Sequence, residues 1–268
     1  MPTDDLPIPR VIPTLLLEDE GMVKTVRYSE PRYLGDPVNV INLFNRFEVD
    51  EIVLLDIGAT VGKADSPYAL IEQLASECWV PLAYGGGIRE LEQIRRVLAL
   101  GVEKVVIGTA AADVPSLVRE AADTFGSQAV VVSVDVRRRG SDGYDVVVER
   151  ATRSLDVDPV AYAVRMAALG AGEILLNAVD RDGTMEGYDL DLIETVCRAV
   201  DIPVIACGGA GDRNDLAGPL LIGASAVAAG SLFVYRGRER GVLVNFPERE
   251  ALEAMLDPVL RQRAAAHA

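Results

Sequence analysis

The sequence predicts an α/β protein, a single (β/α)8 or TIM barrel built from two duplicated half-barrels. One observation is that short runs rich in Val, Ile and Leu alternate along the chain with segments of helical period. This alternation is typical of a parallel sheet with helices outside it. A second observation is an internal repeat in segment 37–231. Glycine and proline residues recur there at an offset of 122 positions, so that Pro81 is matched by Pro203 and Gly86 by Gly208. Glycine and proline at matched positions imply matched turns, and therefore two equivalent halves.

Each expected strand is a short apolar run, as in Val53 to Leu55, and several are apolar on both faces. That is expected where helices cover one side and the barrel interior the other. The expected strands are residues 10–17, 51–57, 81–84, 104–107, 129–135, 173–179, 203–207 and 226–229. The expected helices are residues 38–47, 67–77, 91–100, 114–125, 159–169, 190–200, 214–221 and 248–263. No linker divides the chain, so residues 1–268 are expected to form one domain, with frayed ends at 1–9 and 264–268.

Two long loops leave the carboxyl ends of expected strands, the end of a barrel where active sites are built. Residues 18–36 follow the first strand. Residues 136–158 follow the fifth strand and include a basic turn from Arg137 to Arg139 and a hairpin signal at Asp142 and Gly143. Long loops at this end are more often lids or substrate loops than filler. For the basic turn, a merely solvated loop is an equal alternative.

Composition excludes several classes of function. The net charge is −15, from 26 basic and 41 acidic residues, which argues against binding to nucleic acid or to anionic membranes. No apolar run approaches the roughly 20 residues of a membrane span. The first nine residues lack the basic and apolar regions of a signal peptide. A cytoplasmic protein is expected, in which Cys78, Cys197 and Cys207 are free thiols.

The only histidine, His267, lies in an Ala-rich tail. Catalysis by histidine and metal sites with histidine ligands are therefore not expected. The cysteines show no metal-ligand spacing, and neither a metal nor a cofactor is expected. Proton transfer must fall to carboxylates, lysines or tyrosines.

Glycine-rich turns are the strongest functional signal. Glycine lets backbone N–H groups approach a phosphate, and a following helix N-terminus adds a favourable dipole. Such turns follow the third, fourth, seventh and eighth strands, at Gly85–Gly87, Gly108–Ala110, Gly208–Gly211 and Gly230–Ser231. They form two pairs related by the internal repeat. The pairing predicts a ligand with a phosphate at each end, spanning the barrel mouth.

Charged side chains at strand ends form two further sets. Asp56, Asp135, Asp180 and Asp182 follow strands at the mouth, where carboxylates can move protons. Capping of loops is the alternative, weakest for Asp135 because it ends an otherwise apolar strand. At the opposite end Arg10, Glu51, Lys104 and Glu173 begin strands and alternate in sign around the barrel. From spacing alone, a network that stabilises the barrel is the favoured interpretation of this second set.

Several motifs resemble one known family. They are Arg10-Val11-Ile12, Leu54-Leu55-Asp56, Gly85-Gly86-Gly87-Ile88, the run 125–132 (FGSQAVVV), the run 170–176 (GAGEILL) and Asp180-Arg181-Asp182-Gly183-Thr184. From Arg10 to about Arg236, the chain is similar to the cyclase subunit of imidazole glycerol phosphate synthase. The resemblance implies a barrel duplicated from half-barrels, a doubly phosphorylated substrate, and ammonia supplied by a glutaminase partner at the amino-terminal face of the barrel.

The resemblance also implies roles for individual residues. One phosphate would bind at Gly87, Gly108 and Thr109, and the other at Asp182, Gly183, Gly209, Gly230 and Ser231. Arg10, Glu51, Lys104 and Glu173 match the family's ring through which ammonia enters, which reverses the preference for a purely stabilising network. Asp135 matches one of two catalytic aspartates, and Lys24 matches the lysine of a mobile first loop.

Three positions depart from the family pattern. Leu16 stands where the family has its other catalytic aspartate, Gly108 where it has asparagine, and Gly58 where it has a small hydroxyl residue. Segments 13–17, 24–26 and 242–247 resemble instead a paralogous branch associated with surface-polysaccharide biosynthesis. In that branch a glutaminase, a cyclase-like barrel and a third amidotransferase protein convert an acetamido group into an acetamidino group.

The leading hypothesis is an ammonia-conducting barrel that supports amination of a phosphorylated or nucleotide-linked substrate. Asp135 would be the acid/base, Lys24 a substrate contact on the lid, and Glu103 part of the glutaminase interface. One alternative is a genuine cyclase in which Glu18 or Asp19 replaces the missing aspartate. Another is a noncatalytic scaffold that conducts ammonia and activates the glutaminase.

Overall fold

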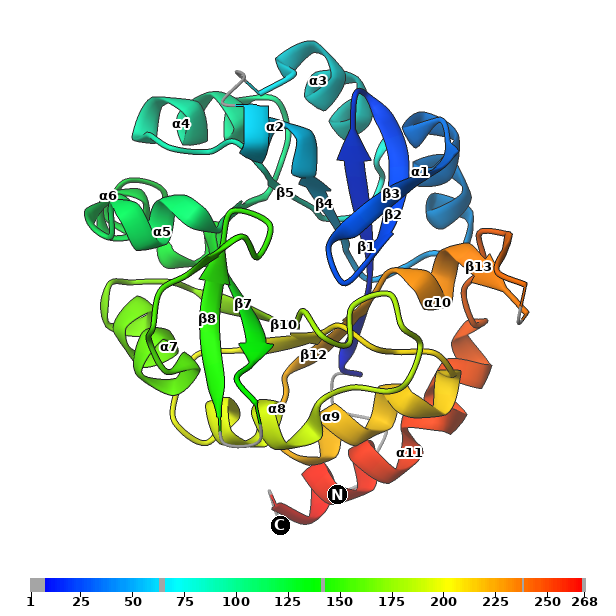
Figure 1. The fold of residues 1–268 in the computed structure, drawn as a ribbon. Helices are drawn as coiled ribbons and strands as arrows, with labels where there is room; N and C mark the ends of the chain where they lie inside the picture. Colours follow the sequence, from blue (N-terminus) through cyan, green and yellow to red (C-terminus); the bar gives the residue numbers. More distant parts are fainter. Residues whose placement is uncertain (1–7, 63–65, 141–142, 238, 267–268) are drawn as a thin grey trace.

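The chain folds into a closed barrel of eight parallel strands with helices around it, as the sequence predicts (Figure 1). The computed structural model describes residues 8–62, 66–140, 143–237 and 239–266. The barrel strands are β1 Arg10–Glu18, β4 Ile52–Asp56, β5 Leu82–Gly85, β6 Lys104–Ile107, β7 Val130–Arg138, β10 Glu173–Ala178, β11 Val204–Cys207 and β12 Ala226–Ala229. Neighbours in this series pair in parallel, and pairing of β12 with β1 closes the barrel.

The barrel has two apolar cores because successive residues of a strand point to opposite faces. An inner cluster lies around the axis and takes side chains from every barrel strand: Ile12, Val53, Ala83, Val106, Val131, Leu175, Ile205, Cys207, Ala226 and Ala228. Their neighbours along each strand face the helices and form a larger outer cluster, which includes Val11, Ile52 and Val130. Burial on both faces explains why these strands appear in the sequence as nearly continuous apolar runs.

Helices connect the strands on the outside of the barrel (Figure 1). They are α1 Pro37–Arg46, α3 Tyr68–Glu77, α4 Leu91–Ala99, α6 Ser116–Phe125, α7 Pro159–Ala168, α8 Leu190–Cys197, α9 Ala217–Leu221 and α11 Arg249–Ala266. Three short helices directly follow strands at the mouth: α2 Ile57–Gly62, α5 Thr109–Asp113 and α10 Ser231–Val234. The predicted helix 214–221 is divided between a 3-10 turn, Arg213–Leu216, and α9, and the predicted helix 190–200 ends earlier, at Cys197.

The internal repeat is visible in the details of the backbone. Helices α1 and α7 each begin with a proline after an aspartate, Asp36 and Asp158, whose side chain accepts backbone N–H hydrogen bonds of the first turn. This is the side-chain N-cap that aspartate commonly provides. Gly86 and Gly208, its partner at the repeat offset, have φ of 115° and 90°. The two halves therefore use the same cap and the same left-handed turn at equivalent positions.

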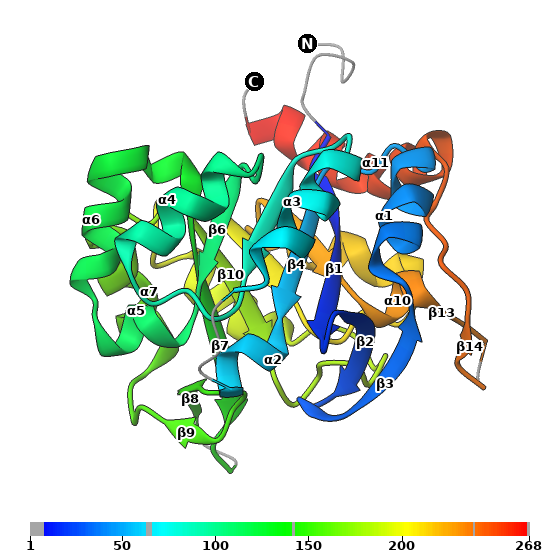
Figure 2. The same cartoon turned by 90° about the horizontal axis from the view of Figure 1, so that it is seen from above.

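Both long loops at the mouth contain strands that the sequence did not predict. Residues 18–36 form an antiparallel hairpin on the end of β1, made of β2 Gly21–Val26 and β3 Ser29–Gly35. The fifth barrel strand extends to Arg138 and pairs with β8 Tyr144–Val148, and a short strand, β9 Arg153–Ser154, follows. The pairing of Arg138 with Tyr144 supports the expected hairpin, although Asp142 of its turn lies outside the described residues. Figure 2 shows these strands projecting from one end of the barrel, opposite α11.

The remaining expectations concern the ends of the chain and the membrane. Of the segments expected to fray, 1–7 and 267–268 lie outside the described residues, whereas α11 continues to Ala266. Among the described residues, no helix combines the length and the apolar character that crossing a membrane requires.

Candidate active site

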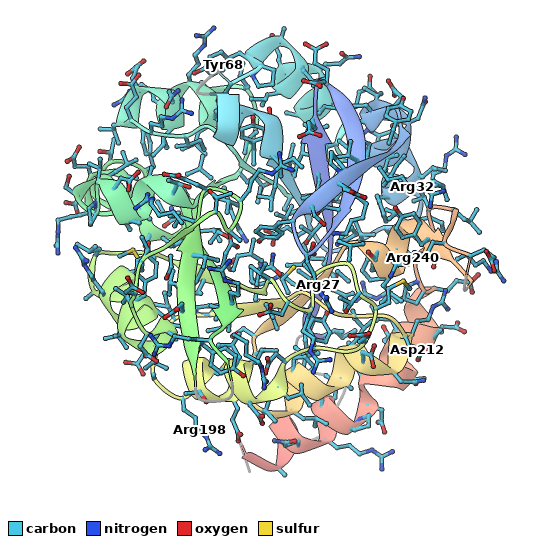
Figure 3. The ribbon with its side chains drawn as sticks, viewed as in Figure 1. Arg27, Arg32, Tyr68, Arg198, Asp212 and Arg240 are labelled. Atoms are coloured by element: carbon cyan, nitrogen blue, oxygen red, sulfur yellow. The ribbon has the colours of Figure 1, made fainter. Side chains whose placement is uncertain are left out.

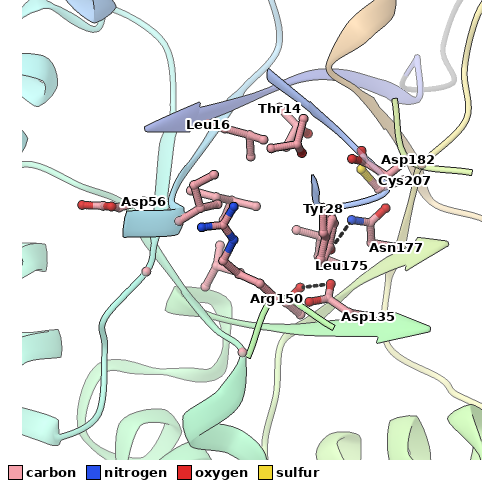
Figure 4. Close-up of a pocket in the computed structure, with 18 of the residues that line it drawn as sticks. Thr14, Leu16, Tyr28, Asp56, Asp135, Arg150, Leu175, Asn177, Asp182 and Cys207 are labelled. Carbon is pink, nitrogen blue, oxygen red and sulfur yellow. Dashed lines mark hydrogen bonds between the residues drawn. The ribbon is translucent and has the colours of Figure 1, made fainter. Parts of the chain in front are cut away.

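A cavity of about 290 Å³ opens at the carboxyl ends of the barrel strands. Its lining includes all eight residues predicted to bind phosphate: Gly87, Gly108, Thr109, Asp182, Gly183, Gly209, Gly230 and Ser231. The proposed catalytic residues Asp135 and Lys24 also line it, as does Leu16 (Figure 4). The structure thus brings together in one pocket every residue predicted to bind phosphate or to act in catalysis, whereas Asp180 is not part of the lining.

The two pairs of glycine turns lie on different walls of this pocket. In the first pair, Gly87 has a φ of 68°, and Gly108 is the N-cap of α5, which begins at Thr109. In the second pair, Gly230 is the N-cap of α10, which begins at Ser231. The Ser231 hydroxyl is buried and has no hydrogen-bond partner in the described part of the chain. Helix N-termini and a free hydroxyl are the donors that a phosphate oxygen needs.

Asp135 lies in the pocket with its carboxylate among hydroxyl groups. The Ser133 hydroxyl donates to Asp135 Oδ1 at 3.1 Å, and the Tyr28 hydroxyl also forms a hydrogen bond with this carboxylate. Burial raises the pKa of Asp135 to about 6, although the hydrogen bonds from Tyr28 and Ser133 lower it. A carboxyl group with a pKa near 6 can both accept and donate a proton close to neutral pH.

Tyr28 is a site residue that the sequence interpretation missed. It sits at the tip of the β2–β3 hairpin with a φ of 63°, and its hydroxyl accepts a hydrogen bond of 2.6 Å from Asn177 Nδ2 (Figure 4). Burial and the carboxylates of Asp135 and Asp182 raise the pKa of Tyr28 well above its ordinary value. The phenol therefore keeps its proton and donates a hydrogen bond to the Asp135 carboxylate. The signal in the sequence was a tyrosine close to Lys24 in a loop at the mouth, in a protein without a usable histidine.

Lys24 and Asp182 bind each other and hold the hairpin against the second half-barrel. Lys24 Nζ donates to both carboxylate oxygens of Asp182, at 3.0 and 3.1 Å, and the lysine side chain is 5% exposed. The backbone N–H of Arg27 donates to the Asp182 carbonyl at 2.9 Å, and Arg27 Nε donates to the Asp180 carbonyl. Figure 3 shows Arg27 over the barrel mouth. The first loop is thus closed over the pocket like a lid.

Two other aspartates at the mouth cap loops, which is the alternative to a role in proton transfer. Asp56 Oδ1 accepts the backbone N–H of Ala59 at 2.9 Å, at the start of α2. Asp180 Oδ2 accepts the backbone N–H of Arg138 at 2.6 Å. These contacts favour a capping role for both carboxylates, although Asp56 also lines the pocket.

Two charged residues at the rim were not predicted to meet. Glu18 ends β1, and Arg150 follows β8. Arg150 Nη1 donates to Glu18 Oε1 at 3.0 Å across the mouth. Asp19, the other proposed replacement for the missing aspartate, is exposed in the turn between β1 and β2, and neither Glu18 nor Asp19 is among the residues that line the pocket.

At the opposite end of the barrel, the four predicted ring residues form one network. Lys104 Nζ lies 2.9 Å from Glu51 and 3.3 Å from Glu173, and Arg10 bonds both glutamates. Burial would lower the pKa of Arg10, but the two glutamates outweigh it and the pKa is raised. Glu103 is exposed next to the ring. The signs alternate around the barrel axis as the sequence predicted.

Comparison with known proteins agrees with this geometry. Residues 10–239 match the family described as histidine biosynthesis protein. A Pseudomonas aeruginosa protein, provisionally named imidazole glycerol phosphate synthase subunit hisF2, is 49% identical over 245 residues, covering 91% of this chain and 98% of that protein. A Leptospira interrogans protein with a similarly provisional name, subunit HisF, is 44% identical over 250 residues, covering 92% and 98%.

A Frankia casuarinae protein, named imidazole glycerol phosphate synthase subunit HisF without that qualification, is 44% identical over 227 residues and covers 84% of this chain and 89% of its own. The extent of these matches, together with the duplicated barrel and its mouth, decides the family. The chain belongs to the histidine biosynthesis protein family and, within it, to the HisF-like cyclase subunits of imidazole glycerol phosphate synthase.

Proposed function

We propose that this chain receives ammonia from a glutaminase partner and supports amination, in particular amidine formation, on a phosphorylated or nucleotide-linked sugar. The observation that carries the proposal is Leu16, which lines the pocket where the family resemblance implies a second catalytic aspartate. Leucine can neither accept nor donate a proton, and losing a general acid or base typically costs about 10²–10⁴-fold in rate. Asp135, Lys24 and the charged ring match the family, whereas Gly108 and Gly58 also depart from it, so the paralogous branch fits this chain better than histidine biosynthesis.

The path of ammonia follows from the arrangement of charge. The ring of Arg10, Glu51, Lys104 and Glu173 would form the entrance, with Glu103 at the interface with the glutaminase. Between the ring and the pocket, the axis is lined by apolar side chains that include Ala83, Ala226 and Ala228. The described side chains of this inner cluster are uncharged, so a small neutral molecule passing among them would meet no charge there, whereas an ammonium ion would lose its hydration. Neutral ammonia would therefore reach the mouth, where the substrate binds.

At the mouth, the two glycine turns would hold the anionic ends of the substrate. Asp135, with a pKa of about 6, is mostly ionised at neutral pH. It can accept the proton that nitrogen loses when ammonia forms a bond to carbon. When the β2–β3 hairpin moves, the Lys24 ammonium would release the Asp182 carboxylate and bind a substrate oxygen instead. A third amidotransferase protein would complete the conversion, and the cytoplasm is the compartment that we propose for this complex.

A genuine cyclase is the second candidate, because the names of the relatives point to that activity and Glu18 offers a carboxylate at the rim. The test is turnover of the cyclase substrate with an ammonium salt. We expect no measurable cyclisation by the wild type and a gain of activity in Leu16→Asp. Rapid cyclisation by the wild type, abolished by Asp135→Asn, would refute the proposal.

The ammonia route is tested in the complex of this chain with its glutaminase partner. Lys104→Met is expected to reduce glutamine-dependent product but not product formed from added ammonium. Arg95→Met, which removes an exposed ion pair on α4, serves as the matched control. If Lys104→Met stops product formation while Asp135→Asn has no effect, the chain is a scaffold and not a catalyst.

A further inference from the structure

Arg150 occupies a position in the pocket that the two phosphate turns do not explain. It lies in the loop after β8, where Glu149, Arg150 and Ala151 have φ of 55°, 57° and 61°. Left-handed backbone is unfavourable for a non-glycine residue, and it persists only where surrounding contacts hold it. One such contact is the backbone N–H of Glu149, which donates to Thr109 Oγ1 at 3.1 Å. The loop is therefore anchored to the first phosphate turn.

The Arg150 guanidinium points into the mouth toward the end of β1 (Figure 4). Its Nη1 donates to Glu18 Oε1 at 3.0 Å, with the two side chains 21% and 22% exposed. Among the described residues, this is its single hydrogen bond, although a guanidinium carries five N–H donors in a planar fork. Of the other cations in the lining, Lys24 is bound by Asp182, and Arg89 donates to the Ala59 carbonyl. Arg89 and Arg150 thus each use one of five donors, but of the two only Arg150 has a carboxylate as its partner among the described residues.

The neighbours of this guanidinium favour an anionic ligand. Leu16 and Glu18 are two residues apart on β1, so their side chains lie on the same face of the strand. Leu16 is 8% exposed and gives the pocket an apolar wall next to the ion pair. Gly58 contributes no side chain near Glu18, and a Cβ there would be in ordinary contact with Glu18 Cγ, at 3.6 Å. An ion pair with little surrounding water is stronger than one at an open surface.

We propose that Arg150 binds a carboxylate of the substrate, as a third anionic group between the two phosphate turns. In the structure, the Glu18 carboxylate accepts one hydrogen bond from Arg150, and the substrate carboxylate would take its place. Arg150 is suited to the task because its planar fork matches a carboxylate in two parallel hydrogen bonds. The proposal rests on the proposed function, which supplies the two phosphate turns, and narrows the substrate to one that carries a carboxylate as well.

The test uses two probes that differ in one group. Glycerol 3-phosphate carries a phosphate alone, whereas 3-phosphoglycerate carries a phosphate and a carboxylate. We expect titration calorimetry of the full chain to give at least about tenfold tighter binding of 3-phosphoglycerate, the usual effect of one charge-assisted pair. In Arg150→Met, this ratio should fall to about one, with binding of glycerol 3-phosphate unchanged. In Glu18→Gln, affinity for 3-phosphoglycerate should rise, because the competing internal carboxylate is neutralised.

Arg139→Met is the matched control, since Arg139 lies on the same hairpin, is exposed, and pairs with Asp145 outside the pocket. The ratio of the affinity for 3-phosphoglycerate to that for glycerol 3-phosphate should be the same in this variant as in the wild type. A wild-type ratio near one, or a ratio that Arg150→Met leaves intact, overturns the proposal. If glycerol 3-phosphate does not bind at all, the phosphate turns and the proposed function fail. In that case, binding of 3-phosphoglycerate that depends on Arg150 would still support the carboxylate site. If 3-phosphoglycerate did not bind either, the carboxylate site would be excluded.

Discussion

Replacing Asp135 by asparagine should stabilise the folded protein at neutral pH. The carboxyl group faces the pocket on one side but is otherwise surrounded by protein, and burial raises its pKa from 3.8 to about 6. At pH values between these two pKa values, the folded chain therefore still holds a proton on Asp135 that the unfolded chain has already released. A difference of this size corresponds to about 3 kcal/mol against the ionised form. That figure is an upper limit, because the pocket admits water.

The sign of the effect sets the design of the experiment. The wild type is expected to lose stability as the pH rises from about 4 to 7, whereas the asparagine variant cannot ionise at this position. Urea unfolding at pH 4.5, 5.5, 6.5 and 7.5 should show the advantage of Asp135→Asn growing to at most about 3 kcal/mol and levelling off above pH 7. Asp201→Asn, at an exposed site, corrects for the loss of one negative charge. A difference that stays constant across this pH range would refute the reasoning.

Three further variants test contacts of the pocket and the barrel. Tyr28→Phe removes a donor that stabilises the Asp135 carboxylate, so the pKa of Asp135, followed by NMR titration, should rise above its value of about 6; an unchanged midpoint would contradict the contact. Lys24→Met leaves Asp182 without its cation and should lower the free energy of unfolding by about 3 kcal/mol; a neutral effect would show that the pair does not hold the lid. Gly172→Ala places a Cβ 2.1 Å from a backbone carbonyl oxygen and should cost about 1–3 kcal/mol by overpacking; an unchanged unfolding midpoint would mean that the backbone relaxes freely.

The barrel strands could be predicted from the sequence within two or three residues at each end because they are buried on both faces. The β2–β3 hairpin could not be predicted, since β3 is almost entirely exposed and contains Pro31. An exposed strand shows no apolar alternation, and its only support is pairing with β2. Strand β8 is different, because it is largely buried and contains Val146 to Val148; the hairpin signal at Asp142 and Gly143 indicated a turn before it, and β7 continues beyond the barrel to pair with it.

Some features of the candidate site could likewise be predicted from the sequence, and others could not. Glycine turns and the charged ring could be predicted, because glycine reports a local backbone requirement and the internal repeat pairs equivalent positions. The contact of Glu18 with Arg150 joins residues 132 positions apart, and that of Tyr28 with Asn177 joins residues 149 apart. Such contacts depend on where two loops meet over the mouth. No local pattern in the sequence carries that information.

The two half-barrels meet at two strand pairs, β6 with β7 and β12 with β1. A fragment made of either half alone would expose an unpaired row of backbone N–H and C=O groups at both of its margins. Open margins of this kind template association with any matching strand. Separately produced half-barrels should therefore associate with each other or form homodimers. Neither fragment would contain the whole pocket, because Leu16 comes from the first half and Asp135 from the second.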